Sequence, residues 1–162
     1  MGADNQQERL DAKWIVGFVD GEGCFHVAIN KLQKMTLGWQ VLPEFRVVQH
    51  QRDEQVLYKI KNYFGFGNVT VNHGDRKEFR VRGLKNLKEI IKFFKENPLN
   101  TSKQRNFQIF SKIVEMMNQG EHLTKEGLDK IAFLSSTMNR QIKPLYLESS
   151  ETLRRTKLFK KV

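Results

Sequence analysis

Cysteine, proline and long apolar runs are all scarce in this chain, and each shortage excludes something. With Cys24 as the only cysteine, the chain forms neither an intrachain disulfide nor a cysteine-based zinc site. Its 3 prolines beside 12 phenylalanines argue against general disorder. The 4 histidines lie far apart and show no metal-ligand spacing. No apolar run approaches the roughly 20 residues of a membrane-spanning helix, so we expect no membrane segment and no disulfide partner.

Positive charge is what the sequence has in excess. Lys and Arg number 28 against 18 Asp and Glu, which gives a formal net charge of +10 at pH 7. Such an excess predicts a polyanionic partner, with nucleic acid first and an acidic membrane surface second. The sequence has no basic amphipathic helix, which disfavours the membrane surface.

The spacing of apolar residues predicts one α+β domain over residues 10–140, between a polar segment at 1–9 and a basic tail at 141–162. Strands are predicted where apolar and polar side chains alternate, and helices where apolar residues recur every three or four positions. The predicted strands are 24–30, 39–49, 68–72 and 77–82. The predicted helices are 10–21, 53–63, 84–95, 102–118 and 124–138. We expect two hairpins joined in one four-stranded antiparallel sheet, with Asp4 or Asn5 capping the first helix and Asp53 the second.

One face of the predicted sheet is apolar and the other is polar. Val69 and Val71 of the third strand are expected on the apolar face, which would pack on the helices. The polar face mixes cations with amide and hydroxyl groups, the set that reads base edges in a DNA major groove. The predicted DNA-binding residues are His26, Asn30, Lys34, Gln40, Arg46, Asn68, Thr70, Asn72, Arg76, Glu78, Arg80 and Arg82. An ordinary solvated sheet face would carry similar residues, and the pattern does not distinguish DNA from RNA.

The stretch WIVGFV, residues 14–19, has no polar side chain on any side of the first predicted helix. A helix that is apolar all round must be buried all round, and the chain's own sheet covers only one side. A second copy of the helix would cover the other side, with two glycines four positions apart letting the backbones approach. The predicted dimer interface is Trp14, Gly17, Phe18 and Gly21. Burial of the whole helix inside one subunit is the alternative.

Asp20 and Glu22 follow this apolar stretch at the negative end of the helix dipole. The dipole disfavours each acid there by about 0.3–1 kcal/mol, and a dimer would add repulsion between the two copies. A bound divalent cation reverses that sign, because carboxylate and carbonyl oxygens are ligands that Mg²⁺ prefers. Together with nucleic-acid binding, this suggests metal-assisted phosphodiester hydrolysis. The alternative is a pair of loop acids in solvent, satisfied by Lys103.

Several segments together resemble the LAGLIDADG homing endonucleases. WIVGFVDGEG at 14–23 is similar to the family signature, and the resemblance extends to FRVVQHQRDEQVL at 45–57, FGFGNV at 64–69, SKQRNF at 102–107 and LTKEGLDKI at 123–131. The signature occurs once, as in the single-motif homodimeric class. The resemblance implies an αββαββα fold whose saddle-shaped antiparallel sheet, backed by helices, sits in the DNA major groove.

The resemblance also implies roles for individual residues. It makes Glu22 the catalytic metal ligand, with the Gly21 carbonyl as a second ligand. The implied cofactor is Mg²⁺, for which Mn²⁺ or Ca²⁺ can substitute in binding. Gln49 would orient water, and Lys103 would stabilise negative charge near the scissile phosphate. Asp20 takes a structural role, and the position where some relatives carry an Arg falls on Asp53, beside Arg52.

For the whole protein, the resemblance implies a homodimer that binds a long, nearly palindromic double-stranded DNA site. It would hydrolyse one phosphodiester in each strand across the minor groove, leave short 3′ overhangs and promote intron mobility, with an organelle as the expected compartment. One alternative is an RNA maturase that helps its host intron splice. Another is a DNA-binding regulator without catalysis, which the presence of Glu22, Gln49 and Lys103 disfavours.

Overall fold

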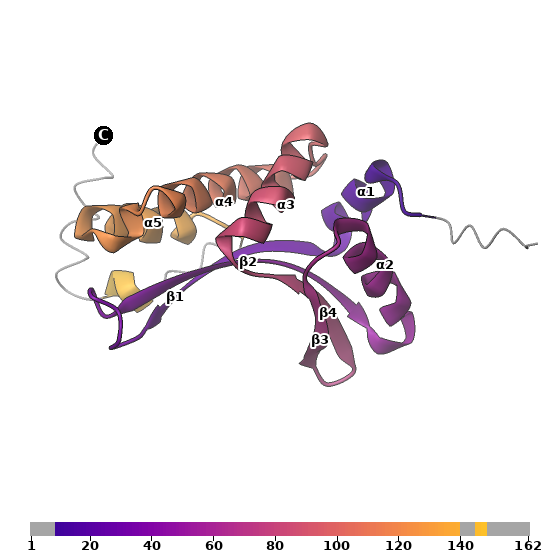
Figure 1. Ribbon diagram of the computed structural model, residues 1–162, viewed down its shortest axis with the longest axis horizontal. Helices are drawn as coiled ribbons and strands as arrows, with labels where there is room; N and C mark the ends of the chain where they lie inside the picture. The colour runs from indigo at the N-terminus through magenta and orange to yellow at the C-terminus, as the bar shows by residue number, and fades with distance from the viewer. Residues whose placement is uncertain (1–8, 140–144, 149–162) are drawn as a thin grey trace, which may run out of the picture.

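The computed structural model describes residues 9–139 and 145–148 (Figure 1). The strands are β1 (Gly23–Lys31), β2 (Trp39–His50), β3 (Asn68–His73) and β4 (Arg76–Val81). The helices are α1 (Ala12–Glu22), α2 (Glu54–Phe64), α3 (Leu84–Glu96), α4 (Lys103–Asn118) and α5 (Lys125–Ser136), with 3₁₀ turns at Gln51–Asp53, Glu121–Leu123 and Leu145–Glu148. The αββαββα order is therefore confirmed, and α4 and α5 follow it as predicted. The predicted N-terminal segment and basic tail lie almost wholly outside the described residues.

The four strands form one antiparallel sheet in the order β1-β2-β4-β3. Each sequential pair is a hairpin, and β2 pairs with β4 where the two hairpins meet, as predicted. Pro43 lies opposite Val27, in a part of β2 that extends beyond β4, so the missing N–H there costs no bond to that neighbour. In Figure 1 the sheet is arched, and all the helices lie on its convex side. Among residues 9–139 and 145–148, no helix lies on the concave side in Figure 1.

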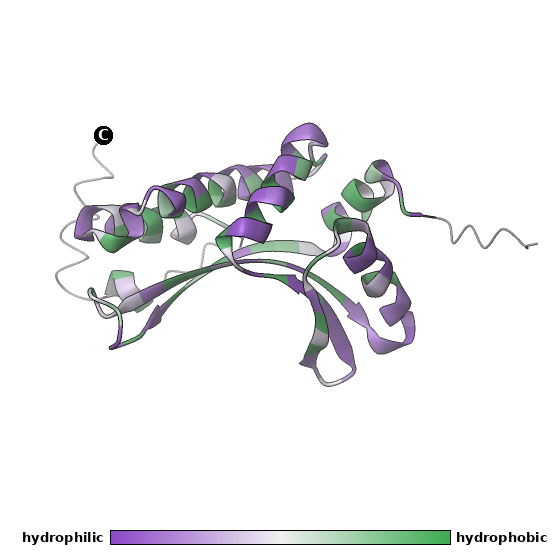
Figure 2. Ribbon diagram, in the orientation of Figure 1, coloured by the Kyte–Doolittle hydropathy of each residue, from purple (hydrophilic) through white to green (hydrophobic). Residues whose placement is uncertain are grey.

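Phenylalanines fill the space between the sheet and the helices. Phe25 of β1 packs on Phe45 of β2 with ring centroids 5.2 Å apart, and on Phe94, Phe107 and Phe110 from α3 and α4 at 5.3–5.5 Å. All five side chains are buried, and each is worth about 1.5–3 kcal/mol relative to an exposed ring. Figure 2 shows hydrophobic and hydrophilic bands alternating along strands and helices, the pattern from which both were predicted.

Two local predictions are wrong, and a third is confirmed only in position. Asp11, rather than Asp4 or Asn5, caps α1, because its carboxylate accepts a hydrogen bond from the Trp14 N–H at 2.7 Å. Asp53 takes the N-cap position of α2, as predicted, but its side chain forms no capping hydrogen bond. Val71 is 66% exposed, because β3 is an edge strand and the β3–β4 hairpin extends beyond the helices that cover the sheet (Figure 1).

Candidate active site and nucleic-acid interface

The last turn of α1 is held from α4 by an ammonium group. Lys103 Nζ donates to the carbonyls of Val19 at 2.8 Å and Asp20 at 3.0 Å, which are among the last carbonyls of the helix. The Val19 carbonyl also accepts a hydrogen bond from the backbone N–H of Gly23. A cation is also favoured at this negative helix end. Burial lowers the pKa of Lys103, and the nearby Cys24, Asp20 and Glu22 partly oppose that shift. In the alternative reading of the sequence Lys103 satisfied the two carboxylates, whereas the structure pairs its ammonium group with backbone carbonyls.

Asp20 is tied to the loop that precedes α4. Its two carboxylate oxygens accept four hydrogen bonds, from the backbone and side chain of Asn100 and of Thr101, at 2.7–3.4 Å. Burial alone would raise the pKa of Asp20, but these bonds lower it below its ordinary value of 3.8. The arrangement joins residues 80 positions apart and fits the structural role that the family resemblance implied for Asp20.

Glu22 is the last residue of α1, and its side chain is exposed. Within the described part of the chain, no hydrogen bond or ion pair is found for its carboxylate, although Glu22 lies near enough to influence Lys103. Gly23 then turns the chain directly into β1. A Cβ on Gly23 would lie 2.5 Å from Val19 Cγ1 and 2.9 Å from the Val19 carbonyl oxygen, so this close approach requires glycine. The tight turn fixes Glu22 at the junction of helix and sheet.

Gln49 lies near the end of β2, next to this junction. Val47 pairs with Gly23, the first residue of β1, so Gln49 is two residues past the point where α1 meets the sheet. Its Oε1 accepts a hydrogen bond from the N–H of His50 at 3.1 Å. The His50 ring in turn lies 2.9 Å from the Asp75 carboxylate. This His50–Asp75 contact connects the end of β2 to the β3–β4 turn, and no sequence pattern predicted it.

The predicted metal ligands are oxygens, as Mg²⁺ requires. Glu22 supplies a free carboxylate, and Gly21 supplies one of the last helix carbonyls. Within residues 9–139 and 145–148, no three Asp, Glu, His or Cys side chains gather as a metal cluster. The ligands that one chain supplies are both oxygens, which suits a hard cation such as Mg²⁺. Most of the coordination positions of the ion would be filled by other oxygen ligands.

The concave side of the sheet, which we call the open face, carries the predicted DNA-binding side chains. Cys24, Arg46, Arg80 and Asn68 form one row across all four strands. The neighbouring rows are His26 with Glu44, Asn30 with Gln40, Glu78 with Thr70, and His50 with Arg76. Lys34 is exposed in the loop between β1 and β2, and Arg82 lies just past the end of β4. The structure thus brings all twelve predicted residues to this face or its rim.

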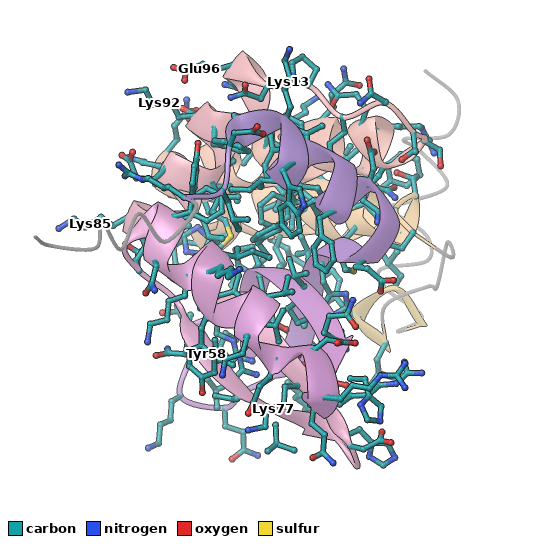
Figure 3. The ribbon with its side chains drawn as sticks, turned by 90° about the vertical axis from the view of Figure 1, so that its right-hand side faces the viewer. Lys13, Tyr58, Lys77, Lys85, Lys92 and Glu96 are labelled. Carbon is teal, nitrogen blue, oxygen red and sulfur yellow. The ribbon has the colours of Figure 1, made fainter. Side chains whose placement is uncertain are left out.

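Lys77 shows that alternate side chains of β4 point to the other side. It forms an ion pair with Glu54 of α2 at 2.8 Å, and this contact raises the pKa of Lys77. Figure 3 shows Lys77 and Tyr58 together at the α2 end of the molecule. The period of two along the strand therefore separates a helix-facing Lys77 from the open-face Glu78 and Arg80.

Two acids on the open face are buried beneath arginines. Glu78 is 3% exposed and Glu44 is 5% exposed. Glu78 Oε1 lies 3.2 Å from Arg80 Nη1, and Glu44 accepts a hydrogen bond from Arg82 Nε. The alternation in the sequence predicted that Glu78 lies on the polar face, but it did not predict the burial of this side chain. Burial lowers the pKa of His26 and neighbouring Arg46 lowers it further, so His26 on this face favours its neutral form.

The outer side of α1 has no cover within the described chain. Ile15, Val16 and Val19 are buried against the sheet, while Trp14 is 39% exposed and stacks on Phe18 with ring centroids 4.8 Å apart. A Cβ on Gly17 or Gly21 would have no atom within 4 Å. At 3.6 residues per turn, Trp14, Gly17, Phe18 and Gly21 share the side opposite the buried one. One subunit therefore covers one side of α1, as the sequence predicted.

The two hairpins, the arched sheet and the acid-bearing helix end define a homing-endonuclease fold. The family model described as LAGLIDADG endonuclease matches residues 15–114, and the chain belongs to this family. The chain is 49% identical to the homing endonuclease I-TnaI, with a TM-score of 0.82 over 90% of this chain and 97% of that one. It is 36% identical to I-LtrWI bound to target DNA, with a TM-score of 0.79 over 87% of this chain and 47% of that one.

Named relatives support the same assignment. The chain is 35% identical to "Probable intron-encoded endonuclease 2" of Neurospora crassa, over 80% of this chain and 29% of that protein. It is 33% identical to "Uncharacterized 50.9 kDa protein in ND4 intron 1" of Podospora anserina, over 72% and 26%. The chain therefore spans only about a quarter of the length of such relatives. No helix in the described residues is long and apolar enough to cross a membrane.

Proposed function

We propose that this protein is a site-specific DNA endonuclease that cuts both strands with a divalent metal ion. The observation that carries the proposal is the exposed carboxylate of Glu22 at the end of α1, which has no hydrogen bond or ion pair among the described residues. It lies near Lys103 and at the rim of the open face. The solved relative I-LtrWI is described as bound to target DNA, and several relatives are named as intron-encoded endonucleases. These names support the reaction class.

DNA binding falls to the open face. Its arginines suit guanine, and its Asn and Gln side chains suit adenine. Phosphate contacts from the basic groups supply affinity, and base contacts supply selectivity. Arg46, Arg80 and Asn68 lie side by side in one row across the sheet, so three side chains able to contact bases are adjacent. A duplex along this face would bring its backbone to the end of α1.

The chemistry falls to the end of α1. Glu22 and the Gly21 carbonyl would hold Mg²⁺, and such an ion supplies an activated water and stabilises charge on the departing 3′ oxygen. Lys103 uses two donors on the α1 carbonyls and keeps a third for a phosphate oxygen. Gln49 accepts from His50 through Oε1, which leaves its amide group to donate to a water molecule. Asp20 positions the loop before α4 and takes no part in hydrolysis.

A second copy of the chain would complete the site. The uncovered side of α1 carries Trp14, Phe18 and two glycines whose added Cβ would meet no described atom within 4 Å. A symmetric contact there would bring two Glu22 side chains together. The oxygens that one chain lacks would come from the second Glu22, water and phosphate. The chain of I-TnaI, which is covered to 97%, shows that a relative with one domain of this size exists. A two-fold dimer would read a nearly palindromic site.

Intron mobility and an organelle setting extend the proposal. Relatives carry names such as "Probable intron-encoded endonuclease 3" and a protein in "ND4 intron 1". Cleavage of an intronless target would allow the intron to be copied into it. We expect cleavage across the minor groove with short 3′ overhangs, as the family resemblance implied.

Selection of cleaved sequences from a randomised duplex library with Mg²⁺ tests the proposal. We expect one enriched, nearly symmetric site, 3′ overhangs and no cutting after chelation by EDTA. Binding should favour this duplex over the transcript of the intron that encodes the protein. Stronger binding to that transcript, with no cut duplex, would establish the maturase alternative instead. Selective binding without cutting would indicate the regulator.

A further inference from the structure

Glu78 occupies the centre of the open face and contacts side chains from three strands. Its Oε1 lies 3.2 Å from Arg80 Nη1 of β4. Its Oε2 accepts a hydrogen bond from Asn72 Nδ2 of β3 at 2.7 Å and lies 4.0 Å from Arg46 Nη1 of β2. One carboxylate therefore connects three predicted DNA-binding side chains.

Glu78 is badly placed to read a base itself. A carboxylate reads cytosine by accepting from its N4 group, which requires a free oxygen at the surface. The Glu78 side chain is only 4% exposed, and both of its oxygens already face protein donors. Its charge also opposes the approach of phosphates. This position favours an indirect role for Glu78 over direct contact with a base.

The partners of Glu78 remain open to DNA. The side chains of Arg46 and Arg80 are 28% and 30% exposed, and each guanidinium has five N–H donors. Contact with Glu78 uses few of these donors and leaves the others for guanine. It also orders a long side chain before binding, which lowers the entropic cost of recognition.

For Asn72, the contact with Glu78 fixes which end of the amide is presented. Because Nδ2 donates to Glu78, Oδ1 is directed to other donors. Adenine reading by Asn requires a defined order of donor and acceptor. A free Asn72 could turn its amide over and lose that order.

Glu44 repeats the arrangement in another row of the same face. It is 5% exposed, and Arg82 donates to it from the end of β4. The same arrangement, a buried acid beneath a surface arginine, therefore occurs twice on this face, in separate rows.

We infer that Glu78 is a positioning residue for sequence selectivity, which holds Arg46, Asn72 and Arg80 in the orientations that read bases. The inference rests on the proposed DNA-binding function. Glu78 also restrains non-specific binding, because its charge offsets part of the arginine charge that phosphates would otherwise meet.

Replacing Glu78 tests this inference through selectivity rather than through affinity alone. Glu78→Gln keeps the shape of the side chain but offers an N–H group to partners that are themselves donors. We expect its preference for the selected site over random duplex to fall by about ten-fold or more, spread over several base positions, while its binding to random duplex tightens. Glu78→Asp keeps the charge and withdraws the oxygens by one methylene, so selectivity should fall without tighter random binding.

Glu89→Gln is the matched control, because Glu89 is exposed on α3 and gives the same change of charge away from the open face. It should leave the base preference unchanged. Thermal unfolding of each variant separates folding defects from reading defects, since a misfolded protein loses binding to all sequences. A wild-type protein without any base preference would overturn the proposed function and this inference together. A wild-type preference that Glu78→Gln and Glu78→Asp both retain would overturn the inference alone.

Discussion

The acids at the end of α1 and the acids on the open face differ in what surrounds them. Glu22 is exposed and has no hydrogen bond among the described residues, because the nearby Lys103 binds backbone carbonyls instead. Glu44 and Glu78 are buried and lie against arginines. The first arrangement leaves a carboxylate free to become a ligand. The second makes each carboxylate an internal counterion that orders the cations above it.

The same contrast separates Asp20 from Glu22, which are two residues apart. Asp20 accepts four hydrogen bonds from the loop before α4, whereas Glu22 accepts none that the described residues provide. Acid type and sequence spacing do not decide the role. The partners brought by α4 decide it.

The largest effect is expected from Glu22→Gln. The substitution keeps the size of the side chain and removes the charge that would hold Mg²⁺. Loss of several kcal/mol of metal-derived stabilisation corresponds to a cleavage rate lower by about a thousand-fold or more. Binding to the selected site should change little, because Glu22 lies outside the base-reading rows. Single-turnover cleavage and binding titration measure the two quantities.

Glu96→Gln serves as the control for this change, since Glu96 ends α3 and is exposed. Figure 3 shows it at the top of the view beside Lys92, with Lys77 and Tyr58 near the bottom. Cleavage should stay at the wild-type rate. Substantial cutting by Glu22→Gln in Mg²⁺ would remove Glu22 from the catalytic site.

Gly17→Leu should have the next largest effect, on the dimer. A Cβ at Gly17 meets no atom within 4 Å, so the single subunit accommodates the side chain, and Leu favours the helix over Gly by about 0.8 kcal/mol. Across a closely packed dimer contact, the added atoms would clash and weaken association by about 10- to 100-fold. Sedimentation measures this, and Gly17→Ala should have a smaller effect. A Gly17→Leu protein as dimeric as the wild type would exclude the α1 interface.

Asp20→Asn should reduce stability and change its pH dependence. The amide has one acceptor oxygen in place of two and directs an N–H group at existing donors, which costs about 1–3 kcal/mol. Because the pKa of folded Asp20 lies below its ordinary 3.8, its ionised form stabilises the protein above that value. The stabilisation is lost as the pH falls through the folded pKa.

Urea unfolding at several pH values tests this prediction. The difference between wild type and Asp20→Asn should be constant near neutral pH and shrink below about pH 4. Glu22→Gln should change the free energy of unfolding by less than about 0.5 kcal/mol. Equal losses from both substitutions would erase the distinction between the two acids.

The sequence predicted the elements better than the contacts of the site. All four strands, the five α-helices and the hairpin pairing followed from local alternation and helical spacing, which are set by neighbouring residues. The bonds of Asp20 to Asn100 and Thr101 join distant segments and were not predictable from spacing. The burial of Glu78 likewise depends on Asn72 and Arg46 from other strands. The predicted burial of Val71 was wrong because alternation predicts which face of the sheet a side chain takes. It does not predict how far the helices extend over that face.

Arg80→Ala is expected to have the smallest effect, and it tests whether the open face reads bases at all. Arg80 is half-buried on Glu78 and lies between Arg46 and Asn68 in one row. Its loss should reduce discrimination at one base pair in each half-site by about 1–3 kcal/mol and leave the preference elsewhere unchanged. Lys85→Ala removes one positive charge from α3, at the left edge of the view in Figure 3, and should leave the base preference at every position of the selected site unchanged. If Arg80→Ala instead weakened binding to all duplexes equally, Arg80 would be a phosphate contact, and the ordering of its guanidinium by Glu78 would serve affinity rather than sequence.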